Sequence, residues 1–147
     1  MKQITFFEDI NLRDEYIERV DILDDVKELI LLPNVDIATT EQVANYYEVP
    51  IEAIRNIVKE HNTELRKDGF VKKAGKATQR LINKYNPERK VVENRIGHFI
   101  VVTKSEEIQM SYSTNALFSK RAILRIGMLV RDSLVGRDIR LALKTVD

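Results

Sequence analysis

The sequence predicts a mainly α-helical protein with one small β-hairpin, on three observations. Residues 39–61 space their apolar side chains as two short helices crossing at a tight turn require. Two runs rich in strand-forming residues, 98–103 and 108–112, flank a polar turn. Amphipathic helical spacing recurs over residues 13–32 and again from Ser119 onward. We therefore expect a winged helix-turn-helix with helical extensions at both ends.

The first predicted element is an amphipathic helix over residues 13–32 that ends at Pro33. Residues 1–36 contain four basic and ten acidic side chains, so this segment has a net charge of −6. An acidic surface repels DNA, which places the segment away from any duplex. Its apolar stripe either covers the core or pairs with a second copy of the chain, and we expect it to be the dimer element.

Residues 39–61 predict the helix-turn-helix itself. Val43 and Ala44 form the buried pair of the first helix, and Val49 fills the turn. Ile54 and Ile57 fall on the inner face of the second helix. The outer face of that helix is then free to meet a major groove.

Both helix starts are signalled locally. Thr39 or Thr40 is the expected N-cap of the first helix, and Pro50 stands where the second begins. Glu48 occupies the turn position that often holds glycine for a left-handed backbone, which is a departure from the common pattern. An ordinary helical hairpin in a small bundle is the alternative interpretation of this segment.

The stretch that follows is strongly basic. Residues 65–90 hold nine Lys and Arg side chains against Asp68 and Glu88 alone, although the whole chain has a net charge of only +1. Phosphate contacts supply affinity and orientation, whereas base contacts supply specificity. A basic segment beside a reading helix therefore favours DNA binding over the alternative of a merely solvated surface.

The remaining helices are predicted from residues that typically start or end a helix. Asp68-Gly69 predicts a helix stop, Gly75 a further break, and residues 77–85 a basic helix. Ser119 is the expected N-cap of the next helix, and Asp132-Ser133 is expected to cap the last one. The last helix is expected to bury, in part, Leu134, Val135, Ile139, Leu141 and Leu143. For Arg121, Arg125 and Arg131 we favour pairing with Asp132 and Asp138 over phosphate contacts.

Residues 38–70, ATTEQVANYYEVPIEAIRNIVKEHNTELRKDGF, and residues 117–140, LFSKRAILRIGMLVRDSLVGRDIR, carry a family resemblance. Together they resemble phage- and prophage-encoded regulatory proteins of the Rha and antirepressor type. The resemblance implies a winged helix-turn-helix regulator of phage or mobile-element origin. Typical members carry alanine where Gly136 stands and an acidic residue near Arg137, so this chain departs from the pattern there.

Catalytic chemistry has little support in the sequence. The chain has no cysteine, and its two histidines, His61 and His98, have no carboxylates at a metal-ligand spacing. No phosphate-binding glycine loop and no nucleophile motif is present. We expect no enzymatic activity, no metal and no cofactor. No apolar run is long enough to span a bilayer, so we expect a cytoplasmic protein without a membrane partner.

The sequence therefore predicts a sequence-specific regulator of transcription, most simply a repressor, that acts by occupying double-stranded DNA as a homodimer. The expected base-reading residues are Ile51, Glu52, Arg55 and Asn56. The expected phosphate-binding residues are Thr40, Lys59, Lys72, Lys73, Lys76 and Arg80. Three regions are expected: the acidic helix (1–36), the helix-turn-helix with its basic segment and hairpin (37–115), and a helical pair on the same core (116–147).

The alternative function is an antirepressor or assembly module that keeps the helix-turn-helix as a scaffold. Its acidic helix would then engage a phage or host regulatory protein. Tyr46 and Tyr47 help to separate the two hypotheses, because burial in a protein interface would favour the module.

Overall fold

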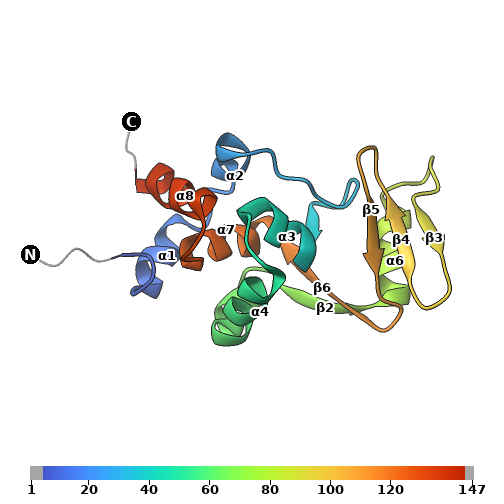
Figure 1. Ribbon diagram of the computed structural model, residues 1–147, viewed down its shortest axis with the longest axis horizontal. Coiled ribbons are helices and arrows are strands. Elements are labelled where there is room, and N and C mark those ends of the chain that lie inside the picture. Colours follow the sequence, from blue (N-terminus) through green and yellow to red (C-terminus); the bar gives the residue numbers. More distant parts are fainter. Residues whose placement is uncertain (1–4, 145–147) are drawn as a thin grey trace, which may run out of the picture.

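The computed structural model describes residues 5–144, which form helices and two three-stranded antiparallel sheets (Figure 1). About 49% of the described residues are helical and 17% lie in strands. The predicted fold class, mainly α with one small hairpin, is therefore wrong, and the protein is a mixed α/β domain. The error arose because four of the six described strands lie outside the two runs that the sequence marked.

The helices are α1 (Ile10–Tyr16), α2 (Asp21–Val26), α3 (Thr40–Tyr47), α4 (Ile51–Glu60), α5 (Asn62–Lys67), α6 (Gly75–Lys84), α7 (Lys120–Leu129) and α8 (Leu134–Lys144). The strands are β1 (Ile37–Thr39), β2 (Val71–Ala74), β3 (Val92–Asn94), β4 (Phe99–Val102), β5 (Glu107–Met110) and β6 (Thr114–Ser119). Most helices gather at one end of the molecule, whereas α6 and strands β3 to β5 lie at the other (Figure 1).

The first sheet has the order β1-β6-β2 and joins the two ends of the molecule. Ala38 in β1 lies opposite Phe118 in β6, and Val71 in β2 lies opposite Leu117. Strand β1 is only three residues long, and β2 reads VKKA without apolar alternation. Neither strand has a local signal, so both depend on their pairing with β6.

The predicted hairpin exists, but it belongs to a second sheet of order β3-β4-β5. Phe99, Val101 and Met110 bury the apolar face of this sheet in a core of its own with Ile82 of α6. The hairpin is thus not the element that borders the helix-turn-helix, as the winged pattern required. That position is taken by β2 and β6, between which α6 and the second sheet are inserted.

The predicted N-terminal helix is two helices, α1 and α2, with a break over residues 17–20. Ile17 and Leu23 are both buried in the main core. Six residues apart, they would point about 120° away from each other on one straight helix. The break brings both side chains to the same core, so the apolar stripe of this segment is used within its own chain.

At the C-terminus, α7 begins as predicted, with the Ser119 side chain accepting from the Ala122 amide. Helix α8 buries Val135, Ile139 and Leu143, but Leu134 and Leu141 are 74% and 58% exposed, so their predicted burial is wrong. They lie seven residues apart on the outer side of the helix. Gly136 is needed here, because a Cβ at this position would lie 2.5 Å from Val130 Cγ1.

Candidate nucleic-acid interface

Helices α3 and α4 form the predicted helix-turn-helix pair. Thr39 and Gln42 make a capping box, in which the Gln42 amide donates to Thr39 Oγ1 (3.2 Å) and the Thr39 amide donates to Gln42 Oε1 (2.9 Å). Glu48 adopts the left-handed conformation, with φ 57° and ψ 47°, that the turn demands. The chain then reverses through Val49, whose amide donates to the Ala44 carbonyl (3.1 Å), and Pro50 precedes α4.

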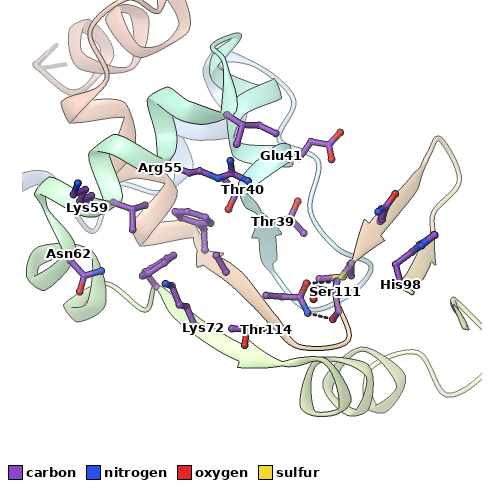
Figure 2. Close-up of a pocket in the computed structure, with 18 of the residues that line it drawn as sticks. Thr39, Thr40, Glu41, Arg55, Lys59, Asn62, Lys72, His98, Ser111 and Thr114 are labelled. Atoms are coloured by element: carbon purple, nitrogen blue, oxygen red, sulfur yellow. Dashed lines mark hydrogen bonds between the residues drawn. The ribbon is translucent and has the colours of Figure 1, made fainter. Parts of the chain in front are cut away.

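A groove of about 810 Å³ runs beside this pair (Figure 2). Helix α4 and the N-terminus of α3 border it on one side, strands β2 and β6 contribute to its lining, and residues of the second sheet border it on the other side. Three cationic side chains, Arg55, Lys59 and Lys72, line this groove against the single carboxylate of Glu41. The groove is therefore a net positive surface that is lined by both polar and apolar side chains.

The predicted base-reading residues divide between two faces of α4. Ile51 and Arg55 line the groove, whereas Glu52 and Asn56 are exposed on the helix outside it. The Arg55 guanidinium forms an i,i+3 ion pair with Glu52, and both side chains are more than 60% exposed. Glu60 lies on the same outward face as Glu52 and Asn56, so that face is acidic and disfavours phosphate.

The predicted phosphate-binding residues divide in the same way. Thr40, Lys59 and Lys72 line the groove, but Lys73, Lys76 and Arg80 do not. Lys72 and Lys73 are neighbours in β2, so their side chains point to opposite faces of the strand. Lys76 and Arg80 are exposed on α6. The basic stretch is thus not one continuous surface.

The two sheets add groove residues that the sequence did not indicate. His98 directly precedes β4 and Gln109 lies in β5, both in the second sheet, whereas Asn115 lies in β6 of the first sheet. The Asn115 side chain is already hydrogen-bonded to the backbone of Ser111. Its Nδ2 donates to the Ser111 carbonyl (2.8 Å), and its Oδ1 accepts from the Ser111 backbone amide (2.9 Å). No local motif marks His98 or Gln109, since they reach the groove only through the long insertion between β2 and β6.

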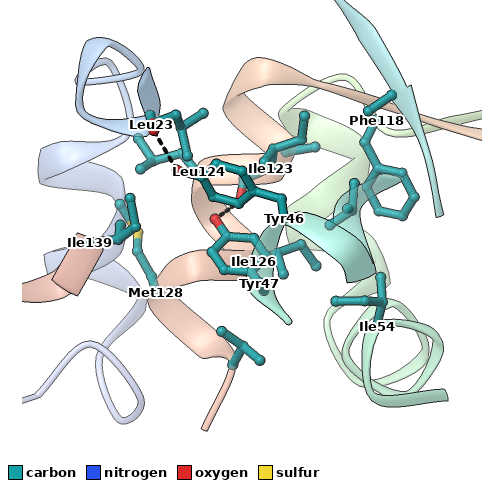
Figure 3. Close-up of a cluster of buried hydrophobic side chains, with 14 of the residues drawn as sticks. Leu23, Tyr46, Tyr47, Ile54, Phe118, Ile123, Leu124, Ile126, Met128 and Ile139 are labelled. Carbon is teal, nitrogen blue, oxygen red and sulfur yellow. Dashed lines mark hydrogen bonds between the residues drawn. The ribbon is translucent and has the colours of Figure 1, made fainter. Parts of the chain in front are cut away.

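Tyr46 and Tyr47 hold α3 in the core of its own chain (Figure 3). The Tyr46 hydroxyl donates to the Leu23 carbonyl, and the Tyr47 hydroxyl donates to the Ile123 carbonyl at 2.6 Å. Burial raises the pKa of Tyr47 well above its usual range, so it stays a neutral donor. Neither ring is presented to a protein partner, which removes one reason for the interaction-module hypothesis.

A buried ion network fixes the helices behind the groove. Arg13 binds Glu64 through two nitrogens (2.6 and 2.9 Å), and Arg125 binds Asp68 in the same manner (2.6 and 3.1 Å). Arg125 also reaches Glu64 Oε1 at 2.7 Å and Asp14 Oδ1 at 2.8 Å. The network ties α1 and α7 to α5, the helix that directly continues α4.

This network corrects the predicted partners of the C-terminal arginines. Arg125 pairs with carboxylates of α5 and its C-cap rather than with Asp132 or Asp138, and Arg121 reaches Glu18 at 3.2 Å. Arg131 lies over the Phe7 ring at 4.3 Å. Local spacing could not reveal these partners, because each is more than 50 residues away or across the fold from its arginine.

The carboxylate of Glu64 is ionised within this network. Burial raises its pKa, but the hydrogen bond from Arg13 and the charge of Arg125 outweigh that effect and hold it below the ordinary value of 4.5. The network is therefore formed by charged groups, whose attraction must offset the loss of their hydration.

Two further findings concern metal binding and membrane-spanning helices. Within residues 5–144, no cluster of three or more His, Asp or Glu side chains is arranged to hold a metal ion. The helices in that range are all too short or too polar to cross a membrane.

Compared with known proteins, the chain matches no family model, no curated protein and no solved structure.

Proposed function

We propose that the protein is a sequence-specific regulator of transcription that binds double-stranded DNA along the groove beside α4. One observation carries the proposal: Arg55, Lys59 and Lys72 come from α4 and β2 and line one groove, next to a capped helix-turn-helix pair. Cations on a rigid helix face are what phosphate binding and base reading require together. Such a regulator would act in the cytoplasm, and occupancy of a promoter would repress it.

Base reading is assigned to the groove face of α4. Arg55 is exposed and can offer two donors to guanine O6 and N7, a contact worth about 1–3 kcal/mol of discrimination. Ile51 adds an apolar contact suited to a thymine methyl group. Asn56 lies one residue further around the helix, outside the groove, where an adenine contact would require the duplex to extend over the acidic face.

Phosphate binding is assigned to Thr40, Lys59 and Lys72. Thr40 is the first residue of α3, where unpaired backbone amides and the helix dipole favour an anion. Lys59 and Lys72 neutralise about two phosphates per copy, which predicts that log K falls with log salt with a slope of about −1.8 per protomer.

Selectivity favours a homodimer, because one helix-turn-helix reads only a few base pairs. The apolar stripe of α1 and α2 is buried on its own core, so it no longer supports assigning the dimer contact to these helices. Their exposed acidic side chains, among them Glu15 and Asp25, would repel a second copy of the same surface.

The test is fluorescence anisotropy on the protein's own promoter fragment and on a scrambled duplex, over a salt series, with the mass measured on the same sample. Arg55→Ala should reduce the preference for the promoter. Lys72→Ala should weaken both duplexes alike, whereas its neighbour Lys73→Ala, which removes the same charge outside the groove, should change binding less.

Three results would contradict the proposal in part or whole. Equal losses for Lys72→Ala and Lys73→Ala would remove the groove as the phosphate site. Equal losses on both duplexes for Arg55→Ala would remove its role in base reading. Absence of binding to either duplex at low salt would overturn DNA binding and favour an antirepressor or assembly module.

A further inference from the structure

The β3–β4 hairpin ends in a two-residue turn, Ile96-Gly97, and Ile96 is 100% exposed. The other large apolar side chains that the structure exposes keep part of their surface covered, with exposures of 40–74%. A single exposed isoleucine means little by itself. The hydrogen bonds that hold its turn and the position of the turn beside the groove make this isoleucine a candidate for contact with a ligand.

The backbone on both sides of Ile96 is held in place. The Arg95 amide donates to the His98 carbonyl (2.9 Å) and to Tyr112 Oη (3.0 Å), and the Tyr112 hydroxyl donates to the Arg95 carbonyl (2.7 Å). The Tyr112 ring packs on Phe99 with 5.6 Å between ring centroids. Gly97 takes the positive φ of 84° that closes the turn. The tip is therefore ordered before it meets a partner, which lowers the entropy cost of binding.

The tip is continuous with the proposed DNA site. Gly97 and His98 line the same groove as Arg55 and Lys59, and Figure 2 shows His98 on the side opposite α4. Arg95 stands beside Ile96 with its side chain 46% exposed, near Glu93 at 3.6 Å. A duplex that occupies the groove would thus meet the tip while α4 reads its bases.

We propose that the β3–β4 tip enters the minor groove next to the major groove read by α4, where Ile96 wedges between two base pairs and kinks the duplex. The inference rests on the proposed DNA-binding function. The minor groove, about 6 Å wide, admits a narrow turn but not a helix. Isolated apolar wedges flanked by arginine are the side chains that unstack base steps there, and arginine is drawn to its negative potential.

The test places 2-aminopurine at successive steps of the promoter duplex and measures its fluorescence on binding, together with the end-to-end distance by energy transfer. The wild-type protein should raise the fluorescence several-fold at one step and shorten the distance. Ile96→Ala should abolish both effects and lower affinity roughly tenfold, whereas Ile96→Phe should keep them. Full exposure of Ile96 means that neither change removes core packing.

Two further variants complete the experiment. Leu134→Ala truncates an exposed aliphatic side chain on α8, away from the groove, and should leave fluorescence and distance unchanged. Arg95→Ala should reduce the salt slope by about 1 and keep the unstacking. A saturating minor-groove ligand such as distamycin should compete with the wild-type protein more strongly than with Ile96→Ala.

The outcomes separate this inference from the function on which it rests. Promoter-specific binding without a local rise in fluorescence, or with the same rise for Ile96→Ala, would overturn the wedge and leave DNA binding standing. An equal loss for Leu134→Ala would also overturn it, since the effect would not belong to the tip. Failure of the wild-type protein to bind any duplex at low salt would overturn both.

Discussion

Replacement of Arg125 by methionine should destabilise the protein severely. Arg125 is 2% exposed and is the only residue described here that binds both Asp68 and Glu64 through hydrogen bonds shorter than 3.2 Å. Methionine fills a similar volume without a charge, so the change mainly removes the guanidinium. Among the residues that the structure describes, the buried carboxylate of Asp68 then keeps only Arg121 as an ion-pair partner, at 4.0 Å and with a side chain that is 45% exposed.

The expected cost is about 3–5 kcal/mol of unfolding free energy, because removing one partner leaves a buried charge uncompensated. The carboxylate of Glu64 loses less of its charge compensation, since Arg13 still binds both of its oxygens. The same truncation at half-exposed Arg121, whose carboxylate partner Glu18 is 77% exposed, should cost no more than about 1 kcal/mol. The two arginines differ mainly in burial, so they form a matched pair.

Urea denaturation followed by circular dichroism measures these costs. Asp68→Asn should also destabilise, but the double variant with Arg125→Met should cost clearly less than the two single costs added, with a coupling of about 2 kcal/mol or more. A cost below about 1 kcal/mol for Arg125→Met, or additive costs in the cycle, would refute the view that this network is a strongly coupled buried unit.

Four further predictions concern the same core and turn. Tyr47→Phe should cost about 1–3 kcal/mol, since it leaves the Ile123 carbonyl without its 2.6 Å donor; a cost near zero in urea would contradict this. Gly127→Ala should destabilise although alanine favours helices, because its Cβ would lie 2.5 Å from Tyr47 Oη, and calorimetry should show a smaller loss in the Tyr47→Phe background. Glu48→Gly should stabilise by up to about 1 kcal/mol by relieving a left-handed non-glycine residue; a lower midpoint in urea would count against that account. The pKa of Glu64 is lower in the folded protein than its unfolded value of 4.5, so the stability that its carboxylate contributes is fully present above that pH and is lost as the pH falls through the folded pKa. The fall in unfolding free energy below about pH 4.5 should therefore be shallower for Arg125→Met than for the wild-type protein.

The helix-turn-helix and the C-terminal helical pair were predictable from interactions between residues close together in the sequence. The Thr39 cap, the Pro50 start and the Ser119 cap all act within four residues of the chain, so the sequence contains both partners of each interaction. Even the left-handed Glu48 was foreseeable, because the turn position demands that conformation whatever residue occupies it.

The first sheet was not predictable in the same way. Partners in β1, β2 and β6 are at least 40 positions apart in the sequence, and β2 is a lysine-rich segment that only its neighbour makes a strand. Contacts at that separation depend on loop closure and on the packing of the whole chain, about which local spacing carries no information. The predicted fold class failed for this reason.

The candidate site shows the same division. The sequence by itself determined which side chains can carry DNA chemistry, since charge and hydrogen-bonding capacity belong to the residue: Arg55, Lys59 and Lys72 were named from the chain alone. Only the tertiary structure decided which of them line one groove, because neighbouring strand positions face opposite ways and Lys73 points away from the groove that Lys72 lines. It also brought the β3–β4 tip with Ile96 beside that groove, through an insertion whose length hid the proximity from any local pattern.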